Sequence, residues 1–144
     1  MNHSRNVFLN LIGVVLLCVT ANITSAQEEG NSRTYKSSYS SVWKATVQSL
    51  VEGGDSIQSQ DKETGTISTE WFVLKEPLIW SRGWRVRENI LIEKVSNDET
   101  KVTLHLLFHN KIRDDEWRPA SNENDYTEPM KSTFFEDINK RLGK

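Results

Sequence analysis

Two long stretches of alternating apolar and polar residues, separated by a short polar turn, constrain the fold more than any other feature of this sequence. Apolar residues occupy nearly every second position of residues 84–95, and residues 100–110 repeat this pattern. The turn between them reads Ser-Asn-Asp-Glu. Because strand side chains alternate between two faces, the pattern predicts an antiparallel hairpin with one apolar face.

Shorter segments on the N-terminal side extend this sheet. Residues 55–60 are mostly polar around one isoleucine, as expected of an edge strand, and residues 66–71 alternate again. The turn sequence Asp-Lys-Glu-Thr-Gly separates the two segments, which predicts a second hairpin. Strict alternation in residues 66–71 places Trp71 on the inner face. Residues 73–83 would then form a long connection, with a strand extension within it left open.

Two segments with the spacing of amphipathic helices frame the strands. From about Ser38 the apolar positions recur every three or four residues. Ser37 or Ser38 can cap the start of this helix, and Gly53-Gly54 ends it. A second series begins after Thr127 and repeats every fourth residue: Met130, Phe134, Ile138 and Leu142. We therefore expect one helix before the strands and a long helix after them.

This order of elements predicts a two-layer α+β domain. We expect an antiparallel sheet of four to five strands, the fifth near Tyr35, with the long C-terminal helix packed on one face. The domain would span residues 35–144. The polar, glycine-containing segment 27–34 would form a flexible N-terminal arm.

The first 26 residues have the three zones of a secretory signal peptide. A polar start with Arg5 precedes a short run of Val, Leu and Ile, and the segment closes on Thr24-Ser25-Ala26. The apolar run is shorter than the roughly 20 residues that span a bilayer. We expect cleavage after Ala26, export to the bacterial periplasm, and no membrane span in the mature chain.

Cys18 leaves one alternative open, an outer-membrane lipoprotein anchored through this cysteine. A lipidation signal requires a small residue directly before the cysteine, and Leu17 stands there, so we do not favour this alternative. Cleavage after Ala26 would remove the only cysteine, and with it any disulfide or thiolate chemistry. The net charge of −2, without a strongly basic block, argues against nucleic acid as a partner.

The first helix and the second hairpin carry a resemblance to a known family. Its residues are Val42-Trp43-Lys44-Ala45, Leu50, Gly54, Ile57 and the turn Asp61-Lys62-Glu63-Thr64-Gly65-Thr66-Ile67. This pattern is similar to that of BamC-like helix-grip envelope domains, which include an accessory lipoprotein of the outer-membrane β-barrel assembly machinery and uncharacterised relatives. The closing pattern from Phe134 to Leu142 resembles the last helix of that family.

The resemblance implies a helix-grip arrangement and an assembly-accessory role in the cell envelope. Its residues form a helix stripe, a helix stop and a hairpin turn, so they bear on the fold more than on the function. The chain departs from the family pattern in two respects. BamC carries two such domains after a lipid-anchored cysteine, whereas this sequence has one domain and an unsuitable lipidation site.

Motifs of catalysis and metal binding are not found in the sequence. His105 and His109 lie four residues apart on a predicted strand, about 13 Å, which is too far for two ligands of one metal. The acidic turn at residues 61–63 lacks the glycine and glutamate spacing of a calcium loop. There is no serine-nucleophile, phosphate-loop or HExxH motif. We expect neither a metal nor another cofactor, and no enzyme activity.

Glu88 interrupts the apolar face of the first long strand, between Val86 and Ile90. A carboxyl group buried there without a partner is costly. One interpretation is a polar anchor at the bottom of a ligand cavity between sheet and helix. The other is a β-bulge, or a position at the open end of the sheet where the carboxyl group reaches water.

Large aromatic and apolar residues in or near loops form the second group of candidate binding residues: Leu78, Ile79, Trp80, Trp84 and Trp117. Trp84 alternates with inward residues, whereas Trp80 and Trp117 have the position of binding anchors. Residues 77–80 are unusually apolar for a connection. They form either an exposed docking patch or lid, or part of the core, and the sequence leaves both open.

Two functions follow as hypotheses. The first is a non-catalytic periplasmic module whose loops or open sheet face contact another envelope protein. It predicts a filled interior and an exposed apolar patch at residues 78–80. The alternative is a carrier or sensor with a small apolar ligand between the long helix and the sheet. It predicts a cavity lined by residues such as Trp84, Ile90, Phe134 and Ile138.

Overall fold

The computed structural model describes residues 30–143, apart from residues 77, 79–80 and 114. In chain order, the elements are β1 (Ser32–Tyr35), α1 (Tyr39–Gly53), β2 (Ile57–Asp61), β3 (Thr66–Thr69), β4 (Phe72–Lys75), β5 (Arg82–Lys94), β6 (Thr100–Ile112), β7 (Arg118–Pro119) and α2 (Thr127–Arg141). The α+β class is thus confirmed. The expected leader and Cys18 lie outside the described residues.

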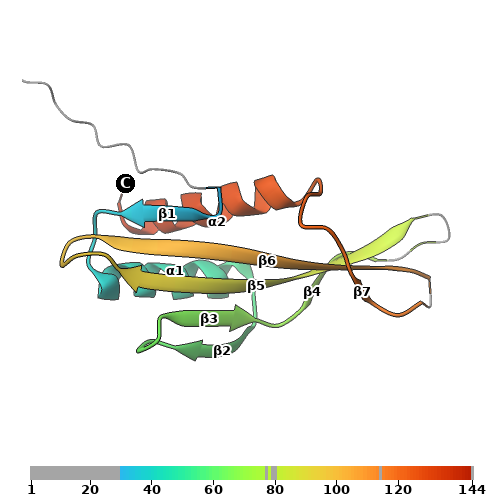
Figure 1. The fold of residues 1–144 in the computed structure, drawn as a ribbon, viewed down its shortest axis with the longest axis horizontal. Helices are drawn as coiled ribbons and strands as arrows, with labels where there is room; N and C mark the ends of the chain where they lie inside the picture. Colours follow the sequence, from blue (N-terminus) through green and yellow to red (C-terminus); the bar gives the residue numbers. More distant parts are fainter. Residues whose placement is uncertain (1–29, 77, 79–80, 114, 144) are drawn as a thin grey trace, which may run out of the picture.

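The sheet is built around the long β5–β6 ribbon (Figure 1). All 13 residues of each strand are paired, from Arg82 opposite Ile112 to Lys94 opposite Thr100. The main strands lie in the order β1-β6-β5-β3-β2, and every pairing is antiparallel. The ribbon extends past the helices, and at that end β4 pairs with β5 and β7 pairs with β6.

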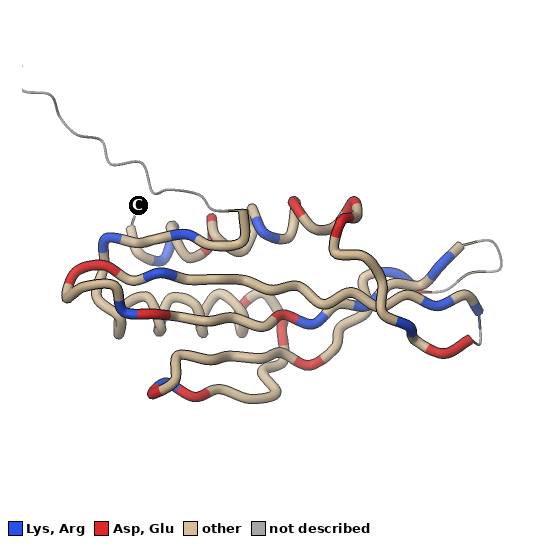
Figure 2. The backbone as a smooth tube through the Cα atoms, in the orientation of Figure 1, with Lys and Arg blue, Asp and Glu red and all other residues tan. Residues whose placement is uncertain are grey.

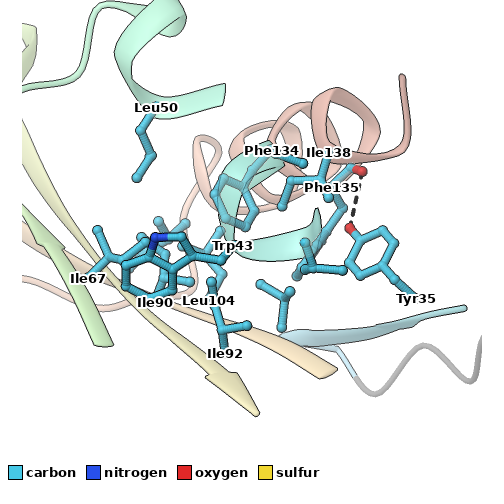
Figure 3. Close-up of a cluster of buried hydrophobic side chains, with 14 of the residues drawn as sticks. Tyr35, Trp43, Leu50, Ile67, Ile90, Ile92, Leu104, Phe134, Phe135 and Ile138 are labelled. Atoms are coloured by element: carbon cyan, nitrogen blue, oxygen red, sulfur yellow. Dashed lines mark hydrogen bonds between the residues drawn. The ribbon is translucent and has the colours of Figure 1, made fainter. Parts of the chain in front are cut away.

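Both helices lie on one face of the sheet and bury the core against it (Figure 1). The inward side chains of β5 and β6 supply the strand side of this core: Val86, Ile90, Ile92, Val102, Leu104, Leu106 and Phe108. Trp43 of α1 and Phe134 of α2 lie against them (Figure 3). The Tyr35 hydroxyl donates to the Phe135 carbonyl at 3.3 Å and so ties β1 to α2.

The ends of α1 form as the sequence predicts. The Ser38 hydroxyl accepts a hydrogen bond from the Ser41 amide, which otherwise has no partner in the first turn. At the other end Gly54 adopts the left-handed conformation, with φ of 95°, and its N–H donates to the carbonyls of Leu50 and Val51. No described helix is long and apolar enough to cross a membrane.

The first strand begins inside the segment that we expected to be a flexible arm. Ser32–Tyr35 pair with β6, from Ser32 opposite Thr103 to Tyr35 opposite Thr100. The arm prediction is therefore wrong for residues 32–34. Their polar character is compatible with a strand because β6 supplies backbone partners and Tyr35 reaches the core.

A break after Thr69 changes which side chains face the core. β3 ends at Thr69 and β4 begins at Phe72, and the amide of Glu70 donates to the Ser56 carbonyl at 2.7 Å. The two residues between the strands shift the alternation by one, so Phe72 pairs opposite Val86 on the inner face. Trp71 lies on the outer face, and the prediction that it belongs to the core is wrong.

Candidate functional site

The sheet face opposite the helices carries a stack of cationic and aromatic side chains. The guanidinium carbon of Arg85 lies 4.5 Å from the ring centroid of Trp71 and 4.8 Å from that of Trp117. Arg87 lies over Trp71 at 4.9 Å, and the Lys111 ammonium lies over Trp117 at 4.8 Å. Cations over aromatic faces attract the ring electrons. We call these five side chains the outer ladder.

Strand alternation positions the cations of the outer ladder. Arg85 and Arg87 are two residues apart on β5 and therefore point to the same face. His109 pairs opposite Arg85 on β6, and Lys111 follows on that face. The break before β4 brings Trp71 to the β5 side, and the segment before β7 supplies Trp117 on the β6 side.

His109 packs into the outer ladder as a neutral side chain. Its ring lies 4.2 Å from the Trp71 ring, centroid to centroid. The Arg85 guanidinium donates to the His109 Nδ1 atom at 3.1 Å, which requires that nitrogen to be unprotonated. Burial and the positive charges of Arg85 and Arg87 lower the His109 pKa. The outer ladder therefore keeps its charge on the arginines and the lysine.

The outer ladder has positive charge without a matching carboxylate. None of the ion pairs within the described part of the chain involves Arg85, Arg87 or Lys111. The Nε atoms of both arginines are buried, and neither has a hydrogen-bond partner among the described residues. Burial and Arg87 lower the Arg85 pKa, but a guanidinium stays charged at neutral pH. Figure 2 shows basic residues gathered where the ribbon extends past the helices.

A pocket of about 320 Å³ lies on the helix side of the sheet, between the end of α1, residues 129–137 of α2, β4 and β5. Six apolar side chains line it: Leu50, Phe72, Leu74, Pro129, Met130 and Phe134. Its acidic residues are Asp55, Glu88 and Asp137, and no Lys, Arg or His lines it. We call it the Glu88 pocket.

Glu88 is buried in this pocket, with 5% of its surface exposed. Its amide donates to the Thr69 hydroxyl at 3.0 Å, but its carboxyl Oε2 atom has no partner among the described residues. Burial, reinforced by the negative charge of Asp55, raises the pKa of Glu88 to about 8. Burial also raises the Asp55 pKa. An empty pocket at neutral pH thus holds a protonated Glu88.

The structure distinguishes between the two interpretations of Glu88. The register of β5 with β6 runs without interruption through Glu88, opposite Leu106, so β5 has no bulge there. The carboxyl group does not reach water at an open end of the sheet, because it is buried beside the pocket. The carboxyl group thus lies between the sheet and the helices, and its role as a ligand anchor stays a prediction.

The other predicted site residues do not form one cluster. Trp84 is half-buried and packs on Phe108 and Tyr126, at centroid distances of 6.4 and 5.9 Å, away from the Glu88 pocket. Leu78 is 62% exposed. Ile79 and Trp80 lie outside the described residues. Of the described residues in this predicted set, Trp117 alone joins the outer ladder.

The cavity differs from the one expected for a carrier. Phe134 lines the Glu88 pocket, whereas Ile90 and Ile138 are buried in the core and do not line it. The pocket lies nearer to β4, because Phe72 and Leu74 turn inward there. The sequence analysis missed both this lining and the cations of the outer ladder. The signal for the ladder was present: Arg85, Arg87 and Lys111 occupy alternate positions on the polar side of two paired strands.

The two histidines of the domain lie at different positions on β6. His105 is exposed opposite Asn89, and His109 is packed against Trp71. Within the described ranges, no group of three or more His, Cys, Asp or Glu side chains is placed to hold a metal ion.

Comparison with known proteins gives a structural neighbour at low sequence identity. No protein-family model matches the chain, and no curated protein shows significant similarity to it. Among solved structures, a DUF4468 family protein from Bacteroides ovatus ATCC 8483 is similar, with 15% sequence identity and a TM-score of 0.49. The match covers 85% of this chain and 92% of that protein.

Proposed function

We propose that this chain is a non-catalytic interaction module that binds an acidic segment of another envelope protein on its outer sheet face. The outer ladder carries this proposal, since it combines three cations, two indole rings and no paired carboxylate among the described residues. Charge and aromatic area together are typical of binding surfaces rather than of plain solvated faces.

Carboxylates suit the outer ladder because of the arginine geometry. A guanidinium presents its N–H groups as a planar fork that a carboxylate can accept in a bidentate manner. The Nε atoms of Arg85 and Arg87 are buried donors without acceptors among the described residues, so a bound carboxylate would satisfy them. The indole rings hold the guanidinium groups in place, which reduces the entropy lost on binding.

A protein segment suits this surface better than a sugar polymer because a strand edge lies beside it. In the described part of the sheet, β4 pairs with β5 alone, so its second edge has free backbone groups. Val73, on the outer face of β4 opposite Arg85, is 48% exposed. An extended peptide could pair with β4 and direct acidic side chains toward Arg85.

An envelope partner follows from the sequence pattern of residues 1–26, from which we infer export to the periplasm. The resemblance to BamC-like helix-grip domains supports an accessory role in an assembly. That role and the absence of enzyme activity are parts of the same proposal, and the binding surface is the part that a direct experiment can test.

The test is fluorescence anisotropy with a labelled peptide of about ten residues that alternates glutamate and threonine, a composition suited to an extended acidic strand. We expect saturable binding that weakens as salt is added, because exposed charges are screened. Arg85→Gln should weaken binding about tenfold, and Arg85→Lys should also weaken it, since lysine lacks the fork. Lys44→Gln, on the exposed side of α1, is the control and should leave binding unchanged.

Three results would contradict the proposal. The first is equal affinity for the same peptide with lysine in place of glutamate. The second is an equal loss of affinity in the Lys44 control variant, which would mean that overall charge rather than the outer ladder matters. The third is tight binding of a sulfated polysaccharide without binding of the peptide, which would assign the surface to a different class of polymer.

A second candidate function, the binding of a small ligand, rests on a separate observation. The Glu88 pocket has an apolar lining and contains a buried carboxyl oxygen without a partner among the described residues. Sites for small molecules commonly combine an apolar lining with a few convergent polar groups. The pocket lies on the helix side of the sheet, so both functions are compatible in one chain.

A further inference from the structure

We propose that the Glu88 pocket selects an organic cation, a protonated amine on an apolar body, with the Glu88 carboxylate as its anchor. The inference gives a ligand class to the second candidate function and rests on that function, independently of the outer ladder. It follows from the shape, the lining and the charge of the pocket.

The apolar part of the ligand would contact both layers of the domain. Phe72 and Leu74 of β4 lie on one side of the pocket, and Met130 and Phe134 of α2 lie on another. Met130, Phe72 and Leu74 are only partly buried, so a ligand there would remove apolar surface from water. Methionine also adapts its shape to irregular ligands.

The three carboxyl groups that line the pocket determine which sign of charge the ligand should carry. Glu88 of β5, Asp55 of the loop after α1 and Asp137 of α2 all line the pocket. Asp137 also contacts Lys140 at 3.3 Å, on an exposed part of α2. The pair Arg141–Glu52 joins α2 to α1 at 2.9 Å, outside the pocket lining. The charge available inside the pocket is therefore negative.

Only a cation satisfies all of these groups. An anionic ligand would be repelled by Asp55 and Asp137, and a neutral alcohol could bond to Glu88 without offsetting any charge. An ammonium group has three N–H donors and a positive charge, so it can bond the Oε2 atom of Glu88 and offset the neighbouring carboxylates. An amine on an apolar body therefore fits both the apolar lining and the carboxyl groups of the pocket.

Binding should also move a proton. In the empty pocket Glu88 is protonated at neutral pH, because burial and Asp55 raise its pKa to about 8. When an ammonium ligand enters, Glu88 releases its proton to solvent and the carboxylate–ammonium pair forms. Affinity for the amine should therefore fall by up to about tenfold for each unit by which the pH drops below that pKa. Asp55 and Asp137 are the other titratable groups that line the pocket.

The experiment is titration calorimetry of the full-length protein with 4-phenylbutylamine, 4-phenylbutanol and 4-phenylbutyrate, which share one apolar body. We expect the amine to bind, the alcohol to bind at least about tenfold more weakly, and the acid not to bind. The amine should bind more tightly at pH 7.5 than at about pH 6. Because binding releases a proton, the measured binding enthalpy should change with the ionisation enthalpy of the buffer. Glu88→Gln should weaken the amine about tenfold, and Glu63→Gln, in an exposed turn, should not.

A second variant, Thr133→Trp, guards against a misfolded Glu88→Gln protein. Thr133 is exposed and lines the pocket, so a tryptophan there should fill the space and abolish amine binding without changing any carboxyl group. No effect of Thr133→Trp would show that the amine binds outside the Glu88 pocket. Equal binding of the three compounds, or no effect of Glu88→Gln, would overturn the cation assignment. Binding of none of them would overturn the site itself. None of these results affects the peptide assay for the outer ladder.

Discussion

The buried carboxyl group of Glu88 should make the stability of this domain depend on pH. In the folded state the pKa of Glu88 is raised from 4.5 to about 8, mainly by burial. Between these values the folded protein holds a proton that the unfolded chain has released. The contribution of Glu88 to the unfolding free energy is thus fully present below about pH 4.5 and is lost as pH rises toward 8.

The expected result in urea unfolding is an unfolding free energy that falls between about pH 5 and 8, by up to roughly 1.4 kcal/mol per pH unit. Glu88→Gln should flatten this dependence, because the amide stays neutral. Glu63→Gln, in the exposed β2–β3 turn, should keep the slope of the original protein. An identical slope in the Glu88→Gln variant would show that Glu88 is ionised in the folded state.

At the residue level the sequence predicted some positions and not others. Glu88 could be recognised because it breaks an apolar alternation, although the sequence could not say whether it reaches water. That depends on α2 and β4, which close over it from distant parts of the chain. The sequence places Trp71 on the wrong face because the alternation shifts by one residue after Thr69. Trp71 and Phe72 are both aromatic, so the sequence does not indicate which of the two faces the core.

Among the elements, the β2–β3 turn contains a glycine, Gly65, whose substitution should strongly destabilise the fold. Gly65 has a φ of 76°, and a Cβ atom built there would lie 2.0 Å from the Ile92 carbonyl oxygen. The Gly65 carbonyl also accepts from the Ile92 amide at 2.7 Å. The turn thus approaches the β5 backbone too closely for any residue with a side chain.

We expect Gly65→Ala to destabilise the domain by about 3 kcal/mol or more, since backbone strain and a backbone clash act together. Gly54→Ala is the matched control: Gly54 also has a positive φ, of 95°, but nothing lies within 4 Å of its added Cβ. That variant should lose only about 1–2 kcal/mol from the strain. Thermal or urea unfolding of both variants measures the difference, and equal losses would disprove the close approach.

Element order was predictable because the local patterns are strong. Both helices, the β5–β6 hairpin and the β2–β3 hairpin follow from periodicity, a serine cap and glycine-containing ends or turns. The short strands β1, β4 and β7 were predicted weakly or not at all. Each is held by pairing with one edge of the long ribbon, which a local pattern of two to four residues cannot indicate.

For the whole molecule, the two proposed sites use opposite faces of one sheet. Arg87 points to the open face, and its neighbour Glu88 points to the helix side. The outer ladder and the Glu88 pocket lie on opposite faces of the sheet, so neither ligand would contact the other. Independent sites have additive energies.

Each substitution should therefore affect one ligand only. Arg85→Gln should leave 4-phenylbutylamine binding within about twofold, and Glu88→Gln should do the same for the acidic peptide. Calorimetry and anisotropy on the two variants check this expectation. If either variant weakens both ligands about equally, then the two faces are coupled through β5, or the substitution has altered the fold.

The measurement that tests the central claim most directly is a nitrogen-15 NMR titration of the protein with the alternating glutamate–threonine peptide. We predict shifts in the Nε–H signals of Arg85 and Arg87, in the indole N–H signals of Trp71 and Trp117, and in the amides of β4. The α1 and α2 amides should not move. Shifts confined to the helices, or to Leu78 and Ser81 without the ladder signals, would contradict the outer sheet face as the binding surface.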